Sequence, residues 1–394
     1  MRRPSMTERG ALTDVRVVDL TTILMGPMAS RILADHGADV IRIDPPGADR
    51  DVAGGPTGIG AIVLDIHRNK RSIVLDLKSE AGRAAALDLI ASADVLVTNM
   101  RAGALERLGL DADTLRAEHP KLIHCVANGY GADGPYADRA AYDDAIQAIS
   151  GLAALPTHIS GEPAYVPSVI VDKTCSMFVV QAVMAALLHR HATGEGQTIR
   201  VPMFETMVSF LLVEHLRGAA LVPPRGELGY PRLLNPNRKP YRCADGWAAI
   251  LPYSDANWRD FFRIIERPEL ADDPRFSTHA ARIDNAVELY QFIVDAAPRH
   301  TVDEWMTICA DHSIPASPVL DIADLFDDEH LQAVELMPVV EHPRAGPYHT
   351  IRHPVGYDTM STEIRHHAPI PGEHTREVLR DLGWTDDRIS ELDP

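Results

Sequence analysis

The stretch VRVVDLTTILMGPMASRILADHGADVIRID, residues 15–44, decides the fold. It opens on a run of β-branched residues, passes through Gly26-Pro27, and closes on a second β-branched run after Gly37. Proline fits the first turn of a helix and glycine commonly follows the last one, so the middle of the stretch predicts a helix. A strand, a helix and a strand with short connections predict two parallel neighbouring strands.

The same alternation continues along the first half of the chain. It indicates a doubly wound α/β lobe, in which ligands usually bind beyond the carboxyl ends of the strands. The predicted strands cover 71–77, 94–99, 122–129 and 198–203, and the predicted helices cover 79–93, 103–108, 142–155, 172–191 and 204–221.

A chain of 394 residues exceeds what one hydrophobic core usually organises. Residues 221–239 are crowded with Pro, Gly and Asn, as a linker or an active-site loop would be. We expect a large domain over 1–224, a smaller α+β domain over 225–330 and a C-terminal segment over 331–394. The smaller domain has a predicted strand (245–253) and helices (256–265, 281–296, 302–311), and the C-terminal segment has two short strands (338–344, 349–357) and a helix (374–383).

The formal net charge of −18 argues against nucleic acid and anionic membranes as partners, because such a surface repels both. A ligand with phosphates needs Arg and Lys gathered at its site. Four scattered cysteines without a CxxC pair indicate a reduced, cytoplasmic protein, and they form no metal-binding pattern. The N-terminus lacks the apolar segment of a signal peptide. The longest apolar run, 177–188, is interrupted by Gln181 and predicts a buried helix.

The sequence lacks the common nucleotide and hydrolase motifs. The junction LTTILMGPM, residues 20–28, has one glycine where GxGxxG requires three, which argues against an NAD-dependent dehydrogenase. GxxxxGK[ST], HExxH and GxSxG do not occur.

Six stretches, taken together and in this order, resemble the family III CoA-transferases, which include formyl-CoA transferases, carnitine CoA-transferases and methylacyl-CoA racemases. The resemblance implies a Rossmann-like large lobe, a small lobe, a C-terminal segment that returns to the large lobe, and an interlocked homodimer. It also implies that acyl-CoA and a small carboxylic acid are the substrates and that no cofactor is tightly bound. The stretches are VVDLTTILMGP (17–27), NKRSIVLDLK (69–78), VTNMRAGALERLGL (97–110), the segment 171–207, IPASPV (314–319) and HAPIPGEHTREVLRDLG (367–383).

The resemblance assigns the nucleophile to Asp172, at the start of a predicted helix. In this role its carboxylate attacks a thioester to form a mixed anhydride, which CoA converts to an aspartyl-CoA thioester. Helix starts and glycine-rich loops supply the N–H donors for the oxyanions, and the helix dipole favours an ionised carboxylate. The alternative interpretation is a helix N-cap, for which aspartate is favoured. The family has a glycine shortly after the aspartate, whereas this chain has Cys175 and Ser176.

The resemblance also assigns residues to CoA. For Lys78 and Arg107 the alternative is a solvated helix end, and for Leu75 it is the core. The chain departs from the oxalate-using enzymes at Thr22, Leu24, Pro45 and Ala140, where they carry His, Gln, Arg and Lys. We therefore expect a larger, less charged acceptor than oxalate. The assigned residues are Thr22, Ile23, Leu24, Met25, Leu75, Lys78, Asn99, Met100, Arg107, Leu108 and Met203.

Tyr142 separates transfer from racemisation, because the racemases of the family carry a catalytic histidine at this position and the transferases carry tyrosine. A 2-methylacyl-CoA racemase and a non-catalytic acyl-CoA-binding protein stay as alternatives. Asp143 is expected to orient neighbours or to cap a helix. The sequence does not identify the acyl-CoA donor, for which succinyl-CoA and acetyl-CoA are the two candidates.

The loop over 225–239 is expected to cover the active site, with Gly226 and Gly229 as hinges. Tyr142 and Tyr230 are assigned, with these two glycines, to the substrate pocket, and Arg238 and Tyr253 to substrate choice. A surface linker is the alternative for the loop.

Overall fold

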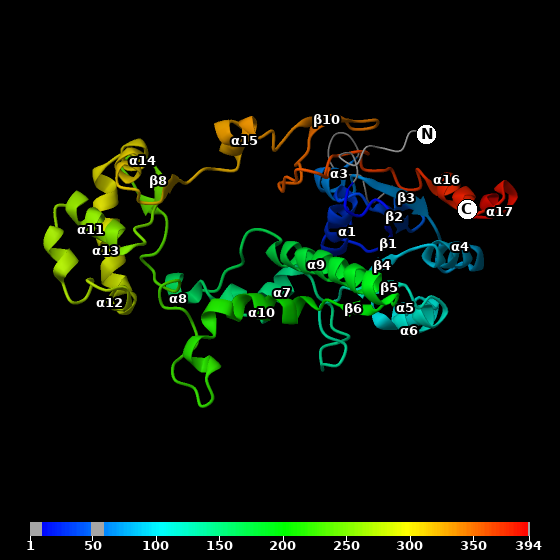
Figure 1. The fold of residues 1–394 in the computed structure, drawn as a ribbon, viewed down its shortest axis with the longest axis horizontal. Coiled ribbons are helices and arrows are strands. Elements are labelled where there is room, and N and C mark those ends of the chain that lie inside the picture. The colour runs from blue at the N-terminus through cyan, green and yellow to red at the C-terminus, as the bar shows by residue number, and fades with distance from the viewer. Residues whose placement is uncertain (1–9, 49–58, 393–394) are drawn as a thin grey trace. The chain divides into compact units, whose positions relative to one another are not determined.

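Residues 10–48 and 59–392 are described in the structure, a computed structural model (Figure 1). Contacts divide the chain into two compact units. Unit 1 comprises 1–150, 167–208 and 329–394, and unit 2 comprises 151–166 and 209–328. From the sequence we expect the main boundary after residue 224, whereas the contacts place it after residue 208.

Unit 1 is built on a six-stranded sheet with the order β3-β2-β1-β4-β5-β6, in which every pair is parallel. Sheets of this kind are buried on both faces, and β1 and β4 are accordingly buried over almost their whole length. The order reverses between β1 and β4, which makes their carboxyl ends the topological switch point. The strands are β1 (Arg16–Leu20), β2 (Asp39–Asp44), β3 (Lys70–Val74), β4 (Val95–Thr98), β5 (Ile123–Val126) and β6 (Thr198–Arg200).

Helices cover both faces of this sheet. One face shares a core with α4 (Glu80–Ala91), α5 (Ala102–Leu108), α6 (Ala112–Glu118), α16 (Thr375–Asp381) and α17 (Asp386–Ser390). On the other face, α1 (Met25–Asp35) packs on α9 (Ile170–Thr193), and α9 also contacts α7 (Asp143–Ile149). By length and composition α9 would qualify as a membrane span, but its contacts with α1, α7 and β5 are those of a core helix.

The predicted strand–helix–strand unit over 15–44 is confirmed. Gly26 is required in the first turn of α1, because a Cβ there would lie 2.3 Å from the Thr21 side chain. Gly37 has a φ of +104° after the helix, a conformation that glycine adopts freely. Gly26 thus keeps the loop after β1 tight against the start of α1, and Gly37 lets the chain turn from α1 into β2.

Unit 2 has a separate, aromatic core that includes Trp258, Phe261, Phe262, Tyr290 and Trp305. A three-stranded antiparallel sheet, in the order β7-β8-β9, supports it. Its elements are α8 (Thr157–Ser160), β7 (Tyr241–Arg242), β8 (Trp247–Ile250), α11 (Asp255–Ile264), α12 (His279–Asp284), α13 (Ala286–Ala296), α14 (Val302–Asp311) and β9 (Ala316–Pro318), while α10 (Met203–His215) begins in unit 1.

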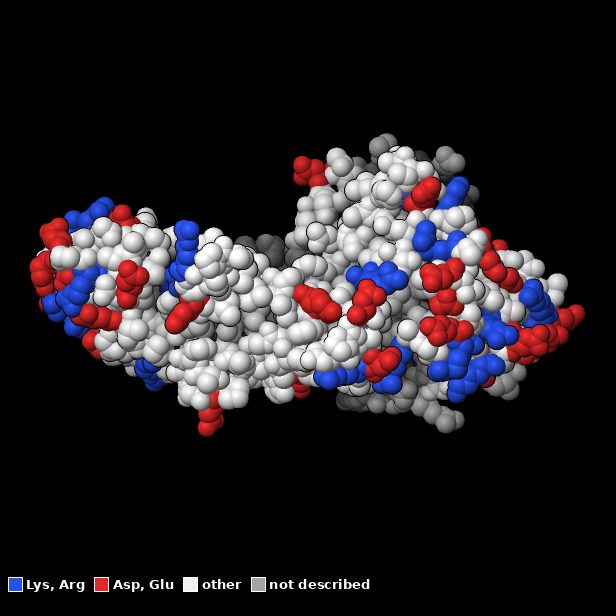
Figure 2. Space-filling view, turned by 90° about the horizontal axis from the view of Figure 1, so that it is seen from below, with Lys and Arg blue, Asp and Glu red and all other residues white. Residues whose placement is uncertain are grey.

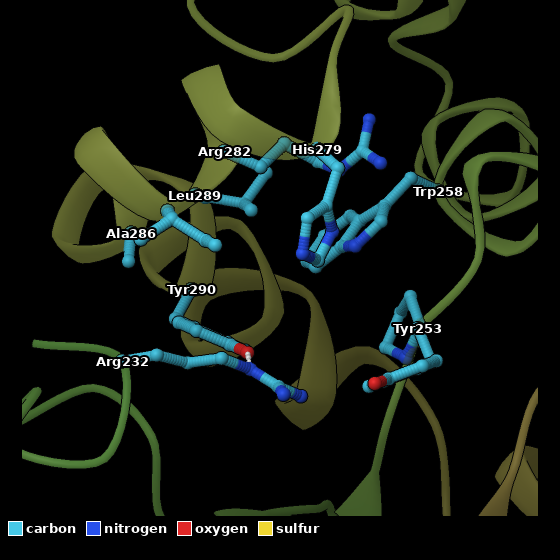
Figure 3. A pocket seen from close by; sticks show the side chains of 10 residues that line it. Arg232, Tyr253, Trp258, His279, Arg282, Ala286, Leu289 and Tyr290 are labelled. Carbon is cyan, nitrogen blue, oxygen red and sulfur yellow. Dashed lines mark hydrogen bonds between the residues drawn. The ribbon is translucent and has the colours of Figure 1, made fainter. Parts of the chain in front are cut away.

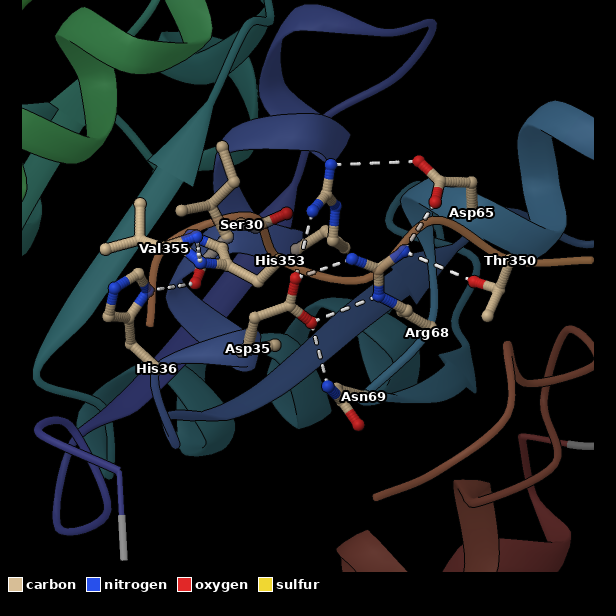
Figure 4. A network of polar contacts seen from close by, with 12 residues as sticks. Ser30, Asp35, His36, Asp65, Arg68, Asn69, Thr350, His353 and Val355 are labelled. Carbon is tan, nitrogen blue, oxygen red and sulfur yellow. Dashed lines mark hydrogen bonds and ion pairs between the residues drawn. The ribbon is translucent and has the colours of Figure 1, made fainter. Parts of the chain in front are cut away.

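The C-terminal segment packs on the first strands of unit 1. Asp35 lies at the centre of a polar network (Figure 4), where its carboxylate accepts hydrogen bonds from Arg31, Arg68 and Asn69 at 2.8–3.2 Å. The Asn69 side-chain oxygen in turn accepts the backbone N–H groups of residues 365 and 366. This network fixes the returning chain to α1 and β3.

Two predicted elements are wrong. The strand expected over 349–357 is absent, since β10 (Val339–His342) pairs with β11 (Gly346–His349) through a turn over residues 343–345, after which Gly346 has a φ of +74°. The helix expected over 142–155 ends at residue 149, and a short 3₁₀ turn follows Gly151, whose φ is +91°. The prediction also missed α15 (Glu329–Ala333) and α3 (Ala61–Ile66).

Candidate functional site

Two loops meet at the switch point of the large sheet. The backbone N–H of Thr22, after β1, donates to Asn99 Oδ1, after β4, at 3.1 Å. Asn99 Nδ2 donates back to the Thr22 carbonyl at 2.9 Å. Ile23 has a φ of 71° and is 64% exposed, an unusual backbone for a β-branched residue. The loop is thus held in one conformation with an apolar side chain in solvent.

A groove with a volume of about 570 Å³ opens beside these loops. Its wall is largely apolar, but it includes the side chains of Lys78, Arg83 and Arg107. None of these three cations has an acidic partner among the described residues, whereas Arg16, Arg71 and Arg190 of the same unit are each paired with a carboxylate. Asp76 is the one acid among the described residues that line the groove. The groove therefore suits a ligand that is both apolar and anionic.

The structure brings together six of the eleven residues assigned to CoA. Thr22, Leu75, Lys78, Met100, Arg107 and Leu108 all line this groove. Leu75 is 2% exposed and therefore belongs to the hydrophobic core as well as to the groove wall. Pro45, where the oxalate-using enzymes carry Arg, lies in the same wall.

Sequence reasoning missed Arg83 as a groove residue. It lies in the first turns of α4, which directly follows β3, and a side chain there faces the carboxyl edge of the sheet. The signal was available, because a basic residue just after a predicted strand end is placed at the ligand-binding edge.

Two of the remaining assigned residues, Met25 and Met203, contact α9 through their backbone carbonyls. Ser176 Oγ lies 2.7 Å from the carbonyl oxygens of both Met25 and Asp172. The Cys175 thiol, which is fully buried, contacts the Met203 carbonyl at 3.9 Å. Burial raises the pKa of this thiol to about 12, so it is a packing group and not a thiolate. The assigned residues Ile23 and Leu24 lie in the loop between β1 and α1.

Asp172 is the third residue of α9, and the N-cap is Val169. The N-cap interpretation of Asp172 is therefore wrong. Asp143 takes that role instead: its Oδ2 accepts the Asp172 N–H at 3.0 Å, and its Oδ1 accepts Gln147 Nε2 at 2.7 Å. The i,i+4 spacing of Asp143 and Gln147 was visible in the sequence, but their contact with Asp172 was not.

Asp172 as a residue is 8% exposed, and its carboxylate accepts no hydrogen bond from the residues that the structure describes. Burial, and secondly the charge of Asp143, raise its pKa to about 6. Asp19 shows what a structural carboxylate looks like in this protein, since it accepts from Ser30, Thr21 and the buried Lys70, with Lys70 Nζ at 2.9 Å. Although burial alone would raise the pKa of Asp19, Lys70 and these hydrogen bonds lower it. A buried carboxylate without such partners is expensive and marks a functional site.

The residues assigned to the substrate pocket fall in both units. Tyr142 directly precedes α7 in unit 1 and is 66% exposed. In unit 2, the backbone of Gly226 lies against Gly218, and Gly229 has a φ of +94°. The N–H of Tyr230 donates to His215 Nδ1 at 3.1 Å, so this stretch folds back on the end of α10.

The sheet, the groove and the unpartnered carboxylate define a doubly wound α/β protein with a site for an anionic, partly apolar ligand. A family model described as CoA-transferase family III matches residues 12–375, and the chain belongs to this family. The predicted resemblance is thereby confirmed.

Relatives and solved structures match over almost the full length. A succinate–glutarate CoA-transferase of Agrobacterium fabrum is 33% identical, over 94% of this chain and 95% of the relative. A formyl-CoA:oxalate CoA-transferase of Streptomyces avermitilis is 31% identical, over 96% of this chain and 97% of the relative. The crystal structure of a CaiB/BaiF family protein from Brucella suis aligns with a TM-score of 0.79 and 29% identity, over 95% of this chain and 100% of the other.

Proposed function

We propose that this protein transfers CoA from an acyl-CoA donor to a carboxylic acid, with Asp172 as the nucleophile. The observation that carries the proposal is the state of that carboxylate: it is buried and without a hydrogen-bond donor or cation among the described residues. Oxygen lone pairs that no donor occupies are available for attack on a carbonyl carbon. At pH 7 a carboxyl group with a pKa near 6 is about nine-tenths ionised.

The reaction proceeds in four exchanges. The Asp172 carboxylate attacks the donor thioester, a C–O bond forms, and CoA leaves as thiolate. The thiolate attacks the Asp172 carbonyl of the anhydride, which releases the donor acid and leaves aspartyl-CoA. The acceptor carboxylate attacks this thioester, again releasing CoA thiolate. The thiolate then attacks the acceptor carbonyl, which gives the new acyl-CoA and restores the Asp172 carboxylate.

The groove at the switch point is proposed to bind CoA. Lys78, Arg83 and Arg107 supply the positive charge that CoA phosphates require on a protein with a net charge of −18. The apolar wall formed by Leu20, Leu75 and Leu108 suits the adenine and the pantetheine chain. CoA enters and leaves as a substrate in this proposal, and no resident cofactor takes part.

We propose succinyl-CoA as donor and a dicarboxylic acid larger than oxalate as acceptor. Overall identity does not decide between acids, because the glutarate and oxalate relatives are 33% and 31% identical. The loop after β1 supports this choice, since Thr22, Ile23 and Leu24 offer no cation or imidazole to a small dianion. Efficient use of oxalate by the purified protein would refute this choice of acceptor.

A homodimer is proposed as the working form. Several large apolar side chains of α9 and α10 are exposed in the single chain, among them Leu188 at 72%, Phe210 at 51% and Val213 at 83%. The face in Figure 2 shows broad uncharged areas between groups of charged side chains. Surfaces of this kind mark association sites. A cytoplasmic location stays a prediction from four free, buried cysteines.

The racemase alternative has no supporting observation. The position that carries the histidine of the racemases holds Tyr142, an exposed phenol. The departure from glycine after Asp172 does not favour a non-catalytic protein either, because Cys175 and Ser176 are small, buried and used in packing.

A panel of acyl-CoA donors and carboxylic acids, followed by mass spectrometry of the thioesters formed, tests the proposal. Wild-type protein should form new acyl-CoA, Asp172→Ala should form none, and Asp144→Ala should match wild type because Asp144 is an exposed carboxylate on the same turn as Asp143. Equal activity in Asp172→Ala would exclude Asp172 as the nucleophile. Exchange of an α-proton of a 2-methylacyl-CoA, without transfer, would favour the racemase.

A further inference from the structure

Unit 2 contains a pocket that the proposed reaction does not use (Figure 3). It lies where α11, α12 and α13 meet residues 232 and 252–253. None of the ten residues that line it is acidic, while two are arginines and one is a histidine. On a chain with a net charge of −18 such a lining is unexpected for ordinary packing.

Trp258 lines this pocket with its indole ring. Its side chain is 4% exposed, and its indole N–H has no hydrogen-bond acceptor among the described residues. The other buried tryptophans are satisfied: Trp305 Nε1 donates to the Ala297 carbonyl and Trp384 Nε1 to Asp88, both at 2.9 Å. An acceptor atom in the pocket, from water or from a ligand, would complete the hydrogen bonding of this indole.

Arg232 adds a positive charge without a carboxylate partner. Its Nε donates to Tyr290 Oη at 2.9 Å, and its guanidinium lies 5.1 Å from the centre of the Tyr253 ring. The described residues include no acid that pairs with it. The second arginine of the pocket, Arg282, differs in this respect, because it is paired with Asp255 and also donates to the Phe276 carbonyl. The pocket therefore keeps one uncompensated cation.

The volume limits what fits. The pocket has a volume of about 20 Å³, which corresponds to about one or two water-sized groups, and one wall is formed by Leu289 and Ala286. A planar carboxylate head is of this size, and its two oxygens suit a guanidinium and an indole N–H together. Figure 3 shows Arg232 and Tyr253 on one side of the space and Trp258 on the other.

We propose that this pocket is a binding site for the carboxylate group of a small organic acid, held by Arg232 and Trp258. The site lies within unit 2 and involves neither Asp172 nor the CoA groove. It adds to the proposed transfer a second place at which the acids in solution are recognised. The rest of the acid stays outside the pocket, which makes the site selective for the charge and not for the chain length.

The indole N–H resonances of the full-length protein report on the site directly. The chain has four tryptophans, and Trp258→Phe identifies the resonance of Trp258 by its loss from a ¹⁵N-tryptophan spectrum. Glutarate and acetate should move this resonance saturably at constant ionic strength, and the neutral glutaramide should not. The measurement needs no CoA and no turnover, so it succeeds or fails independently of the proposed transfer.

Variants separate a carboxylate site from a packing feature. Arg232→Gln should weaken glutarate binding at least tenfold, because it removes the charge and keeps a side chain of similar length. Arg242→Gln should leave it unchanged, since Arg242 lies outside the pocket, over the Trp247 ring. A Trp258 resonance that does not move, that moves equally with glutaramide, or that titrates equally in Arg232→Gln would overturn the proposal and leave a pocket for water.

Discussion

Substitution of Asp143 by asparagine should shift the pH dependence of the reaction toward acid. The Asp143 charge is the second cause, after burial, of the rise in the pKa of Asp172 to about 6. Asparagine removes this charge while its side-chain oxygen still accepts the Asp172 N–H. The total rise is about two units, and burial is the larger part, so the pKa should fall by less than about one unit.

The size of the effect can be calculated for kcat/KM, whose pH dependence reports the pKa values of the free enzyme. If Asp172 must be ionised, wild-type kcat/KM at pH 5 is about one-tenth of its plateau, since the pKa is near 6. In Asp143→Asn the value at pH 5 should rise to at most about half of the plateau. Because asparagine offers one acceptor oxygen in place of two, the bond from Gln147 is lost, at a cost of about 1–3 kcal/mol in stability.

The assay is the rate of acyl-CoA formation between pH 4.5 and 8 at constant ionic strength. Asp144→Asn removes an exposed charge from the same helix and should leave the midpoint in place. Gln147→Met removes the hydrogen bond to Asp143 but keeps its charge, and should not lower the midpoint. A midpoint in Asp143→Asn that equals the wild-type value, or lies above it, would refute the electrostatic reasoning.

Three further predictions concern charge and stability. Asp172→Asn should raise the free energy of unfolding, because the raised pKa of Asp172 means that ionisation of this group destabilises the folded state. The gain over wild type should grow between about pH 4 and pH 6, stay constant above that, and reach at most about 3 kcal/mol, less where solvent screens the charge. Urea unfolding measures the gain, and a gain that falls as the pH rises would contradict this sign. Lys70→Met should cost about 3–5 kcal/mol in the same measurement, because it leaves Asp19 buried without its cation, and a cost below 1 kcal/mol would count against the ion pair. Arg83→Gln should weaken CoA binding about tenfold in calorimetry and reduce the salt dependence of binding. Arg101 is exposed and lies outside the groove, so Arg101→Gln should change neither quantity. If Arg83→Gln binds CoA as tightly as wild type, Arg83 is not part of the phosphate site.

The sequence predicted those parts of the fold that local patterns determine. The unit over 15–44 follows from β-branched runs punctuated by Gly26 and Gly37, and α9 was placed within two residues of its observed ends, Ile170 and Thr193. The error at 349–357 has a local cause too, since the chain turns at residues 343–345 and the strand that pairs with β10 ends at His349.

The site was harder to predict because its decisive contacts are not local. Asp143 caps α9 from 29 residues upstream, and no periodicity in the sequence indicates that contact. Within residues 10–48 and 59–392, Asp172 lacks a hydrogen-bond partner and three cations of the groove lack an acid, and both facts become visible only in three dimensions. The pocket beneath Trp258 depends in the same way on the meeting of three helices.

The most direct test of the central claim is to look for CoA bound covalently to Asp172. Wild-type protein incubated with an acyl-CoA donor and no acceptor should gain a CoA adduct in its intact mass. The adduct should map to the peptide with Asp172, be released by an added acid as the new acyl-CoA, and be absent from Asp172→Asn. An adduct on another residue, or full transfer activity in Asp172→Asn, would contradict the account.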